Sequence, residues 1–190
     1  MKKAYIFVFG ASSTLLLSTF LFVIVPRLGQ SEVVQEGRSA QLPYTEVQAR
    51  GRAVYIEYGC IYCHSQQVRD PVAGADGHFG WGRPSRPSDY IYDRPHLLGT
   101  SRTGPDLSNI GLRQPSRDWH HLHLYNPRLL VPWSIMPGFP FLYRVVPGEQ
   151  APAEGAIEIP NSKGNWLLPS EKASSLVEYL TCLKRDGETP

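Results

Sequence analysis

The stretch Gly59-Cys60-Ile61-Tyr62-Cys63-His64 decides what the rest of the chain has to build. Two cysteines separated by two residues and followed directly by a histidine form a C-x-x-C-H motif, which is typical of covalent attachment of a c-type haem. In that chemistry each thiol adds to a vinyl group of the macrocycle, and the histidine is then held against the iron. The spacing predicts Cys60 and Cys63 as attachment residues and His64 as an iron ligand.

Other chemistries also use paired cysteines, namely a redox dithiol, a plain disulfide and one half of a zinc site. A zinc site needs a second Cys or His pair at suitable spacing, and Cys182 is the one remaining cysteine. A thioredoxin-like dithiol needs a βαβ setting, which the sequence does not predict. Cys182 falls on the apolar side of a C-terminal helix, which indicates a buried and inert thiol. Haem attachment is therefore the favoured interpretation.

An electron-transfer haem needs a sixth iron ligand, and methionine is the ligand that raises the reduction potential. Met1 is the initiator, so Met136 is the candidate, in a loop that Pro137 and Pro140 make rigid. The alternative use of a methionine is to fill a gap in the core. Histidine ligation also stays open, and the rival residues are His78, His96, His120, His121 and His123.

The segment Gly104-Pro105-Asp106-Leu107 has the form G-P-x-L. A ligating histidine normally donates its second ring N–H to a fixed acceptor, and a rigid proline carbonyl suits that role. We therefore predict that the carbonyl of Pro105 orients His64 beside the haem. A simple turn is the alternative, because Gly-Pro is a common turn dipeptide.

Apolar periodicity predicts three helices around these motifs. The first covers residues 44–58 and stops at Gly59, directly before Cys60. A second short helix begins at Ser116 and is halted by Asn126-Pro127, and the last begins near Ser170. Residues 65–105 and 132–169 show no usable period. The expected fold class is mostly α, a cytochrome c-like helical domain with long loops.

The N-terminal run from Ala4 to Val25 carries no charge over 22 residues. As a helix it would be roughly 33 Å long, enough to cross a hydrocarbon core of about 30 Å. It is longer than the roughly 7–15 residues of a signal-peptide core and lacks a small-x-small cleavage site, so we expect an uncleaved anchor. Lys2 and Lys3 place the N-terminus in the cytoplasm and the remaining chain across the membrane. The expected organisation is an anchor over 1–27, a tether over 28–43 and a mono-haem domain over 44–186.

The charge distribution excludes some function classes. Lys2, Lys3 and Arg27 flank the apolar run. The other sixteen of the nineteen basic residues are balanced by seventeen acidic residues, so the domain is near neutral. Nucleic-acid binding depends on a concentrated basic face and is not expected. Paired carboxylates and Ser/His/Asp constellations at recognisable spacing are absent from the sequence, so it gives no sign of hydrolysis. The chain alone is expected to relay electrons without catalysing a reaction.

Together these motifs resemble class I c-type cytochromes, in which the first and last helices cross. Gly51-x-x-x-Tyr55 and Leu176-x-x-Tyr179 are similar to that crossing pair. More specifically, the chain resembles the mono-haem subunit II of cbb3-type cytochrome c oxidases. The matching stretches are Pro43-Tyr44-Thr45, Gly59-Cys60-Ile61-Tyr62-Cys63-His64-Ser65-Gln66, Arg102-Thr103-Gly104-Pro105-Asp106-Leu107, Asp118-Trp119-His120, Tyr125-Asn126-Pro127-Arg128 and Met136-Pro137.

The resemblance implies a haem domain on the periplasmic side of the bacterial cytoplasmic membrane, anchored by one helix. It implies that one covalent haem c relays electrons from a donor cytochrome c to a membrane-embedded catalytic subunit that reduces oxygen. The complex would be an oxidase, although this subunit would not be catalytic alone. The family also has a calcium ion near a subunit interface, for which Thr100 and Ser101 are the candidates here.

Alternatives within the same class are the cytochrome c subunit of a nitric oxide reductase and a free membrane-anchored electron shuttle. The long irregular loop over 66–102 favours a fixed partner over a shuttle. An alternative from another class is a haem enzyme or sensor with an open iron site, which requires Met136 to be off the iron.

Overall fold

The computed structural model describes residues 2–72, 74, 76–148, 154–162 and 164–186. The chain forms two compact units, one from Met1–Gln41 with Arg86–Ile91 and one from Leu42–Ser85 with Tyr92–Pro190. Helices dominate both units, so the predicted mostly α fold with one N-terminal apolar helix is confirmed.

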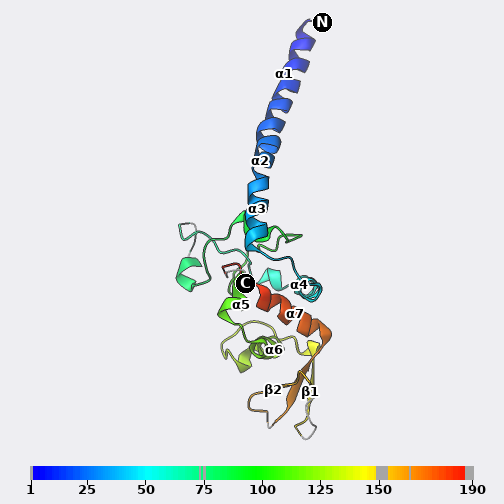
Figure 1. The fold of residues 1–190 in the computed structure, drawn as a ribbon, viewed down its shortest axis with the longest axis vertical. Helices are drawn as coiled ribbons and strands as arrows, with labels where there is room; N and C mark the ends of the chain where they lie inside the picture. The colour runs from blue at the N-terminus through cyan, green and yellow to red at the C-terminus, as the bar shows by residue number, and fades with distance from the viewer. Residues whose placement is uncertain (1, 73, 75, 149–153, 163, 187–190) are drawn as a thin grey trace. The chain divides into compact units, whose positions relative to one another are not determined.

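The first unit contains one long helical run, drawn in blue in Figure 1. It consists of α1 (Lys2–Thr19), a π-helical turn (Phe20–Ile24), α2 (Val25–Leu28) and α3 (Gln30–Ala40). The π turn lies just before Pro26, whose ring would clash with a carbonyl one turn earlier in a regular α-helix. In the described part of the chain, Lys3–Ala40 is the one helix long and apolar enough to cross a membrane. The segment expected to be a tether over 28–43 is thus helical over 30–40.

A short segment of the long loop packs against α3 within this unit. It contains the 3₁₀ turn η4 (Pro87–Tyr90) and meets the helix at Gly37. A Cβ on Gly37 would lie 2.6 Å from the carbonyl oxygen of Ser88 and 2.5 Å from a methyl carbon of Ile91. Only glycine permits so close an approach at this position.

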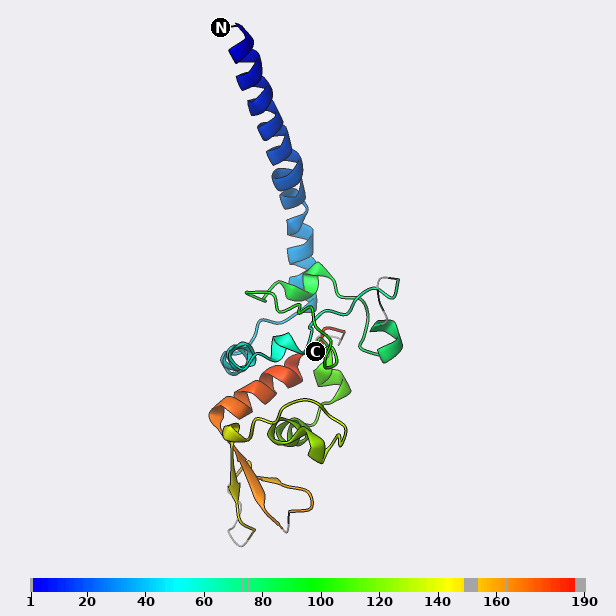
Figure 2. The ribbon, with the colours of Figure 1, turned by 180° about the vertical axis from the view of Figure 1, so that it is seen from behind.

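The second unit is built on a crossing of two helices, α4 (Glu46–Glu57) and α7 (Glu171–Cys182). Figures 1 and 2 both view the cyan α4 nearly end-on while the orange and red α7 runs across the view. A Cβ on Gly51 would overlap the backbone of Ser175, and the rings of Tyr55 and Tyr179 meet edge to face at 5.6 Å. The crossing expected from the resemblance is therefore confirmed.

Side-chain caps set where these helices begin. Thr45 and Gln48 form a reciprocal capping box at the start of α4, and Ser170 accepts from the backbone N–H of Ala173 at the start of α7. Ser116 caps α6 (Arg117–Tyr125) in the same way, as predicted. The remaining short helices are α5 (Ile110–Arg113), η2 (Cys60–Tyr62), η3 (Asp76–Phe79), η5 (Pro127–Leu129) and η6 (Pro140–Leu142).

A small antiparallel sheet occupies part of the stretch over 132–169 that the sequence analysis expected to be irregular. Its strands are β1 (Tyr143–Val146), β2 (Ile157–Glu158) and β3 (Trp166–Pro169), in the order β1-β3-β2. Tyr143 pairs with Pro169 and Ile157 pairs with Leu167. Leu167 is fully buried in a cluster with Leu122 of α6, so the sheet packs on that helix. Strands of two to four residues are too short to show an alternating pattern.

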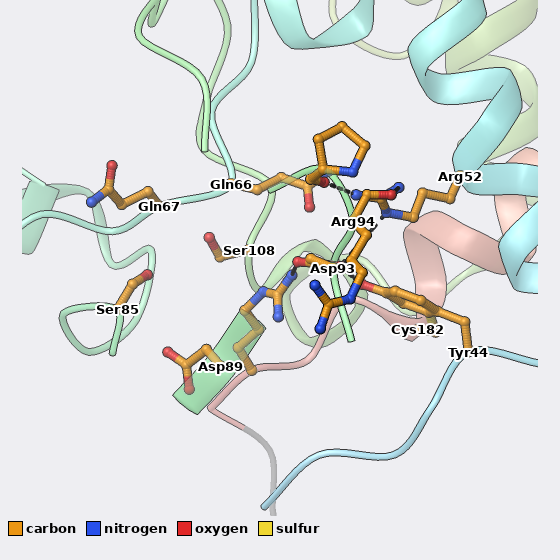
Figure 3. A network of polar contacts seen from close by, with 12 residues as sticks. Tyr44, Arg52, Gln66, Gln67, Ser85, Asp89, Asp93, Arg94, Ser108 and Cys182 are labelled. Atoms are coloured by element: carbon orange, nitrogen blue, oxygen red, sulfur yellow. Dashed lines mark hydrogen bonds and ion pairs between the residues drawn. The ribbon is translucent and has the colours of Figure 1, made fainter. Parts of the chain in front are cut away.

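A buried charge network joins the long loop to α4 and to the segment that follows α7 (Figure 3). The carboxylate of Asp93, 2% exposed, accepts from Tyr44 Oη at 2.7 Å and from Arg185 at 2.6 Å. The Nε of Arg52 lies 3.6 Å from the same carboxylate, and its guanidinium donates to the carbonyls of Arg94 and Pro95. Removing the carboxylate would take a partner from two buried cations, a loss that typically costs about 3–5 kcal/mol.

Candidate cofactor site

The C-x-x-C-H motif sits on a tight turn directly after α4. Gly59 has φ of +70°, a left-handed conformation that ends the helix at little cost because glycine has no Cβ. The carbonyl of Cys60 then accepts from the backbone N–H groups of Cys63 at 3.2 Å and His64 at 3.0 Å. This turn gathers both thiols and the histidine ring in one place.

The environment of Cys60 disagrees with a redox dithiol. Burial raises the pKa of its thiol to about 11, and Cys60 packs against the main hydrophobic cluster. The attacking cysteine of a redox dithiol has its pKa lowered by nearby positive charge or a helix N-terminus. The environment of Cys60 is thus not that of an attacking thiol.

A cavity of about 400 Å³ opens beside this turn. Its size falls within the range of about 300–1,000 Å³ that is usual for cofactor sites. Its walls are mostly apolar, with Leu107, Ile110, Leu124, Val131 and Leu180 among them. Of the residues predicted for the site, Cys63, His64, Pro105 and Met136 line the cavity. Cys60 is not in its wall and lies on the adjoining hydrophobic cluster, which Met136 also contacts.

The ring of His64 is oriented by the carbonyl of Pro105, to which its Nδ1 donates at 2.7 Å. Because a carbonyl can only accept, this bond assigns the proton of the neutral ring to Nδ1 and leaves the Nε2 lone pair for a metal. Burial lowers the pKa of His64, while the Pro105 bond and the charge of Asp106 act in the opposite direction. A neutral imidazole with one committed nitrogen is the form in which histidine binds iron.

Gly104 makes that hydrogen bond sterically feasible. A Cβ at this position would clash with the His64 ring, lying 2.7 Å from Nδ1 and 2.9 Å from Nε2. The backbone N–H of Gly104 donates to the carbonyl of Cys63 at 2.9 Å, and that of Leu107 donates to Ser65 at 2.8 Å. The G-P-x-L segment therefore runs alongside the histidine, and its two ends are hydrogen-bonded to the residues directly before and after His64.

Met136 lies in a loop that is tied to the end of α6. Its backbone N–H donates to the hydroxyl of Ser134 at 3.2 Å, and the N–H of Phe139 donates to the carbonyl of Leu124 at 2.8 Å. A Cβ on Gly138 would lie 2.7 Å from the carbonyl oxygen of Tyr125, so this loop passes close to the helix. The loop holds the thioether in the wall of the cavity that also contains His64.

Two of the rival histidines, His120 and His123, line the same cavity. His120 is committed elsewhere, because its Nε2 donates to the carbonyl of Gln114 at 2.8 Å. The ring of His123 stacks on Trp119 with centroids 4.5 Å apart, and its Nδ1 is buried without a hydrogen-bond partner. His121 lies against Tyr143 outside the cavity wall, and His78 and His96 are exposed. Among the rivals, His123 is thus the one that the structure brings nearest to a ligand role.

Four buried polar residues hold the segments that bear the site residues, and the sequence did not predict them as part of the site. Ser65, Gln66 and Asp106 are fully buried, and Arg102 is largely buried. Gln66 accepts from the hydroxyl of Tyr179 on α7 at 3.0 Å, which joins the segment after His64 to the helix crossing. The signal that could have found them is their position inside the C-H-S-Q and R-T-G-P-D-L stretches, where buried polar side chains need partners.

Arg102 connects three parts of the long loop. Its Nε donates to Ser65 Oγ at 3.0 Å, a second nitrogen donates to the carbonyl of Gln67 at 2.7 Å, and a third pairs with the buried Asp76. Its guanidinium also lies 5.3 Å from the ring centre of Trp81. A stretch without secondary-structure periodicity is thereby held in one conformation around the site.

The calcium expectation receives no support. The hydroxyl of Ser101 lies 3.0 Å from that of Thr103, and Thr100 is exposed. In the part of the chain that the structure describes, no group of three or more His, Cys, Asp or Glu side chains could hold a metal ion.

The residues present fit a covalently attached haem. The thiol of Cys63, the His64 ring and the thioether of Met136 line one apolar cavity, and Cys60 lies on the adjoining hydrophobic cluster. The hydrogen bond from Nδ1 of His64 to Pro105 leaves Nε2 free for iron. A sequence model described as "Cytochrome C oxidase, mono-heme subunit/FixO" matches residues 1–158 of the chain. Among curated proteins, none matches the chain. The matched range includes the apolar helix, the C-x-x-C-H motif and Met136.

Proposed function

Since the chain belongs to the family of mono-haem subunits of cbb3-type cytochrome c oxidases, we propose that Cys60 and Cys63 carry its haem and that His64 and Met136 ligate the iron. Membership makes the chain an electron-transfer subunit with one haem c, which works together with other oxidase subunits. It also sets aside the nitric oxide reductase and free-shuttle alternatives. When bound, the haem supplies a one-electron couple.

Several residues of the chain adapt the site to one-electron transfer. The carbonyl of Pro105 keeps the ring proton on Nδ1 and so leaves the lone pair of Nε2 available to the iron. Met136, held by Ser134 and by the end of α6, supplies a soft ligand that favours the reduced iron. The apolar walls exclude water, which also raises the potential because a dry environment disfavours the more highly charged ferric state.

We extend the proposal to topology and partners. Residues 1–27 anchor the chain in the bacterial cytoplasmic membrane, and residues 28–43 connect this anchor to the haem domain. Residues 44–186 form the haem domain on the periplasmic side. Lys2 and Lys3 before the apolar helix support this orientation. Electrons would arrive from a donor cytochrome c and pass to the catalytic subunit.

The observation that carries the assignment is the meeting of His64 and Met136 on one cavity, from distant segments of the chain. The test uses the full chain, purified in detergent from cells that attach c-type haem. The ferric protein should show the weak near-infrared band that marks methionine on haem iron. Met136→Leu should abolish this band, while Ile135→Leu, a volume-conserving change at the neighbouring and largely exposed position of the cavity wall, should preserve it. Persistence of the band in Met136→Leu would rule Met136 out.

His123 is the second candidate for the sixth ligand, because it lines the cavity and has an unpartnered ring nitrogen. If Met136 is the ligand, His123→Leu should keep the near-infrared band. If His123 is the ligand, the wild-type protein should lack the band and His123→Leu should become high-spin.

A further inference from the structure

We propose that Asp106 is a positioning residue that locks the two segments holding His64 and lowers the reduction potential of the haem through its buried charge. The inference rests on the proposed role of His64 as an iron ligand. It concerns how this chain sets the reduction potential of its haem, beyond the effects of the C-x-x-C-H motif and of Met136.

The contacts of Asp106 place it directly behind the ligand. Its side chain is fully buried. Oδ2 accepts from the hydroxyl of Ser65 at 2.6 Å and from the backbone N–H of Gln67 at 2.7 Å, and Oδ1 accepts from the N–H of Ser108 at 2.8 Å. Ser65 follows His64 in the chain, and Pro105 precedes Asp106. The carboxylate therefore fastens the segment that carries the ring to the segment that orients it.

All three donors are the kind that stabilise an ionised carboxylate. Backbone N–H groups can only donate, so Oδ2 is an acceptor for Gln67 and Oδ1 is an acceptor for Ser108. Two arginines stand around it. Arg113 donates to the backbone carbonyl of Asp106, and Arg102 donates to Ser65 Oγ, the group that bonds the carboxylate. The charge is held by the fold and is not exposed to screening by salt.

This charge acts on the ring that would ligate the iron. The carboxylate accepts from Ser65, the residue directly after His64. The carbonyl of Pro105, directly before Asp106, accepts from the His64 ring, so the negative charge lies close to the imidazole. Arg113 donates to the carbonyl of Asp106 and brings a positive charge to the same region. The ferric haem carries one more positive charge than the ferrous form. A buried negative charge stabilises the ferric state and lowers the potential, and a nearby positive charge does the reverse. Asp106 would thus oppose the increase in reduction potential that a methionine ligand produces.

The test is a redox titration, followed by visible absorption, of the detergent-solubilised full chain with its haem attached. Asp106→Asn keeps the shape and removes the charge, and we expect the midpoint potential to become more positive. Arg113→Gln should make it more negative. Loss of structure alone would not move the two variants in opposite directions.

A matched control exists in the other buried carboxylate network. Asp93→Asn makes the same chemical change at a side chain that is 2% exposed and bonded to Tyr44 and Arg185. It should lower the unfolding midpoint and leave the potential unchanged. The proposal is overturned if Asp106→Asn and Arg113→Gln shift the potential in the same direction, or if Asp93→Asn shifts it as much as Asp106→Asn.

If Asp106→Asn does not retain haem, Ser65→Ala replaces it. This variant preserves the charge and removes one compensating donor, so the potential should become more negative, and a positive shift would contradict the proposal. Recording the near-infrared band on every sample separates the two hypotheses. If the wild-type protein lacks the band, Met136 is not the ligand. If the wild-type protein has the band but the variants do not shift the potential in opposite directions, only the proposed role of Asp106 is wrong.

Discussion

Gly104 is the residue of the site with the most stringent steric requirement. Gly104 lies against the face of the His64 ring, and its neighbour Pro105 supplies the carbonyl that fixes the ring. The ring and the backbone segment have to be this close because the hydrogen bond between Nδ1 and the carbonyl oxygen is 2.7 Å long. Any side chain at position 104 would compete with the imidazole for the same space.

Gly104→Ala should therefore reduce haem attachment. The methyl group would force the imidazole or the loop to move, and overpacking of this kind costs about 1–3 kcal/mol. We expect a several-fold lower ratio of covalent haem to protein, measured by the absorption of the denatured haem adduct. Gly74→Ala is the control, since its Cβ would meet only ordinary contacts at 3.6 Å or more. Equal haem content in the two variants would show that the ring tolerates the methyl group.

His121 should make stability depend on pH. Burial lowers the pKa of His121 from 6.5 to about 4, and repulsion by His120 and Arg117 adds to the effect. Between these values the unfolded chain binds a proton that the folded chain does not, so stability falls as the pH drops from about 6.5 to about 4. The side chain contacts Tyr143 and lies outside the cavity wall, so it is not among the residues that would hold the haem.

The check is denaturant unfolding of the wild type and His121→Phe at pH 7 and pH 4.5. The wild type should lose more free energy of unfolding between these pH values than the variant, by on the order of 1–3 kcal/mol. Titration of the carboxylates is common to both proteins and cancels in the comparison. Parallel losses would mean that His121 is not kept neutral by the fold.

Among the elements, the crossing of α4 and α7 organises everything else in the second unit. α4 delivers Cys60 at its end, and α7 contributes Leu180 to the cavity wall and Tyr179 to the bond with Gln66. The two helices approach so closely at Gly51 that a Cβ would overlap the backbone of Ser175. A change in the crossing would therefore move both the attachment turn and the cavity wall.

Gly51→Ala should destabilise the haem domain although alanine is the better helix former. The intrinsic gain of about 1 kcal/mol in a helix is outweighed because the clash is with backbone, which cannot rotate away. We expect the thermal unfolding midpoint of the domain to fall by several degrees. Gly10→Ala, a helical glycine with open space around it, should leave that midpoint unchanged. A raised midpoint for Gly51→Ala would refute the close approach.

At the scale of the whole molecule, the chain divides into a unit containing the apolar helix and a unit containing the haem cavity. The two hydrophobic clusters that the structure describes, around Tyr55 and around Leu167, consist of residues of the second unit. The helix has none of its apolar window buried in protein, which fits a segment whose surroundings are lipid. Folding of the haem domain should thus be separable from anchoring.

Replacing residues 1–25 with a cleavable signal peptide tests this separation. We expect a water-soluble haem protein, with the spectrum of the full chain, in the periplasmic fraction. The full chain should remain in the membrane fraction after a high-salt wash, because insertion of an apolar helix is not weakened by salt. A replacement protein that stays in the membrane, or that carries no haem, would contradict the assignment of residues 1–27 as the anchor alone.

The sequence by itself determined those features that depend on residues close together in the chain. The spacing of Cys60, Cys63 and His64, the uncharged run over 4–25, the cap at Ser116 and the helix start near Ser170 are local, so they can be recognised without a fold. The family resemblance added the crossing at Gly51, which the structure confirms, and the relay function, which the match over residues 1–158 confirms.

Only the tertiary structure decided which distant residues meet. It brought Met136 and His123, but not His78 or His96, to the cavity of His64, and it placed Asp106 behind the ring. It also formed a sheet from strands too short to show a period, because Leu167 gains its stability from packing on α6 and not from its neighbours in sequence. Such contacts depend on burial and on the path of the whole chain, and neither is encoded in a local pattern.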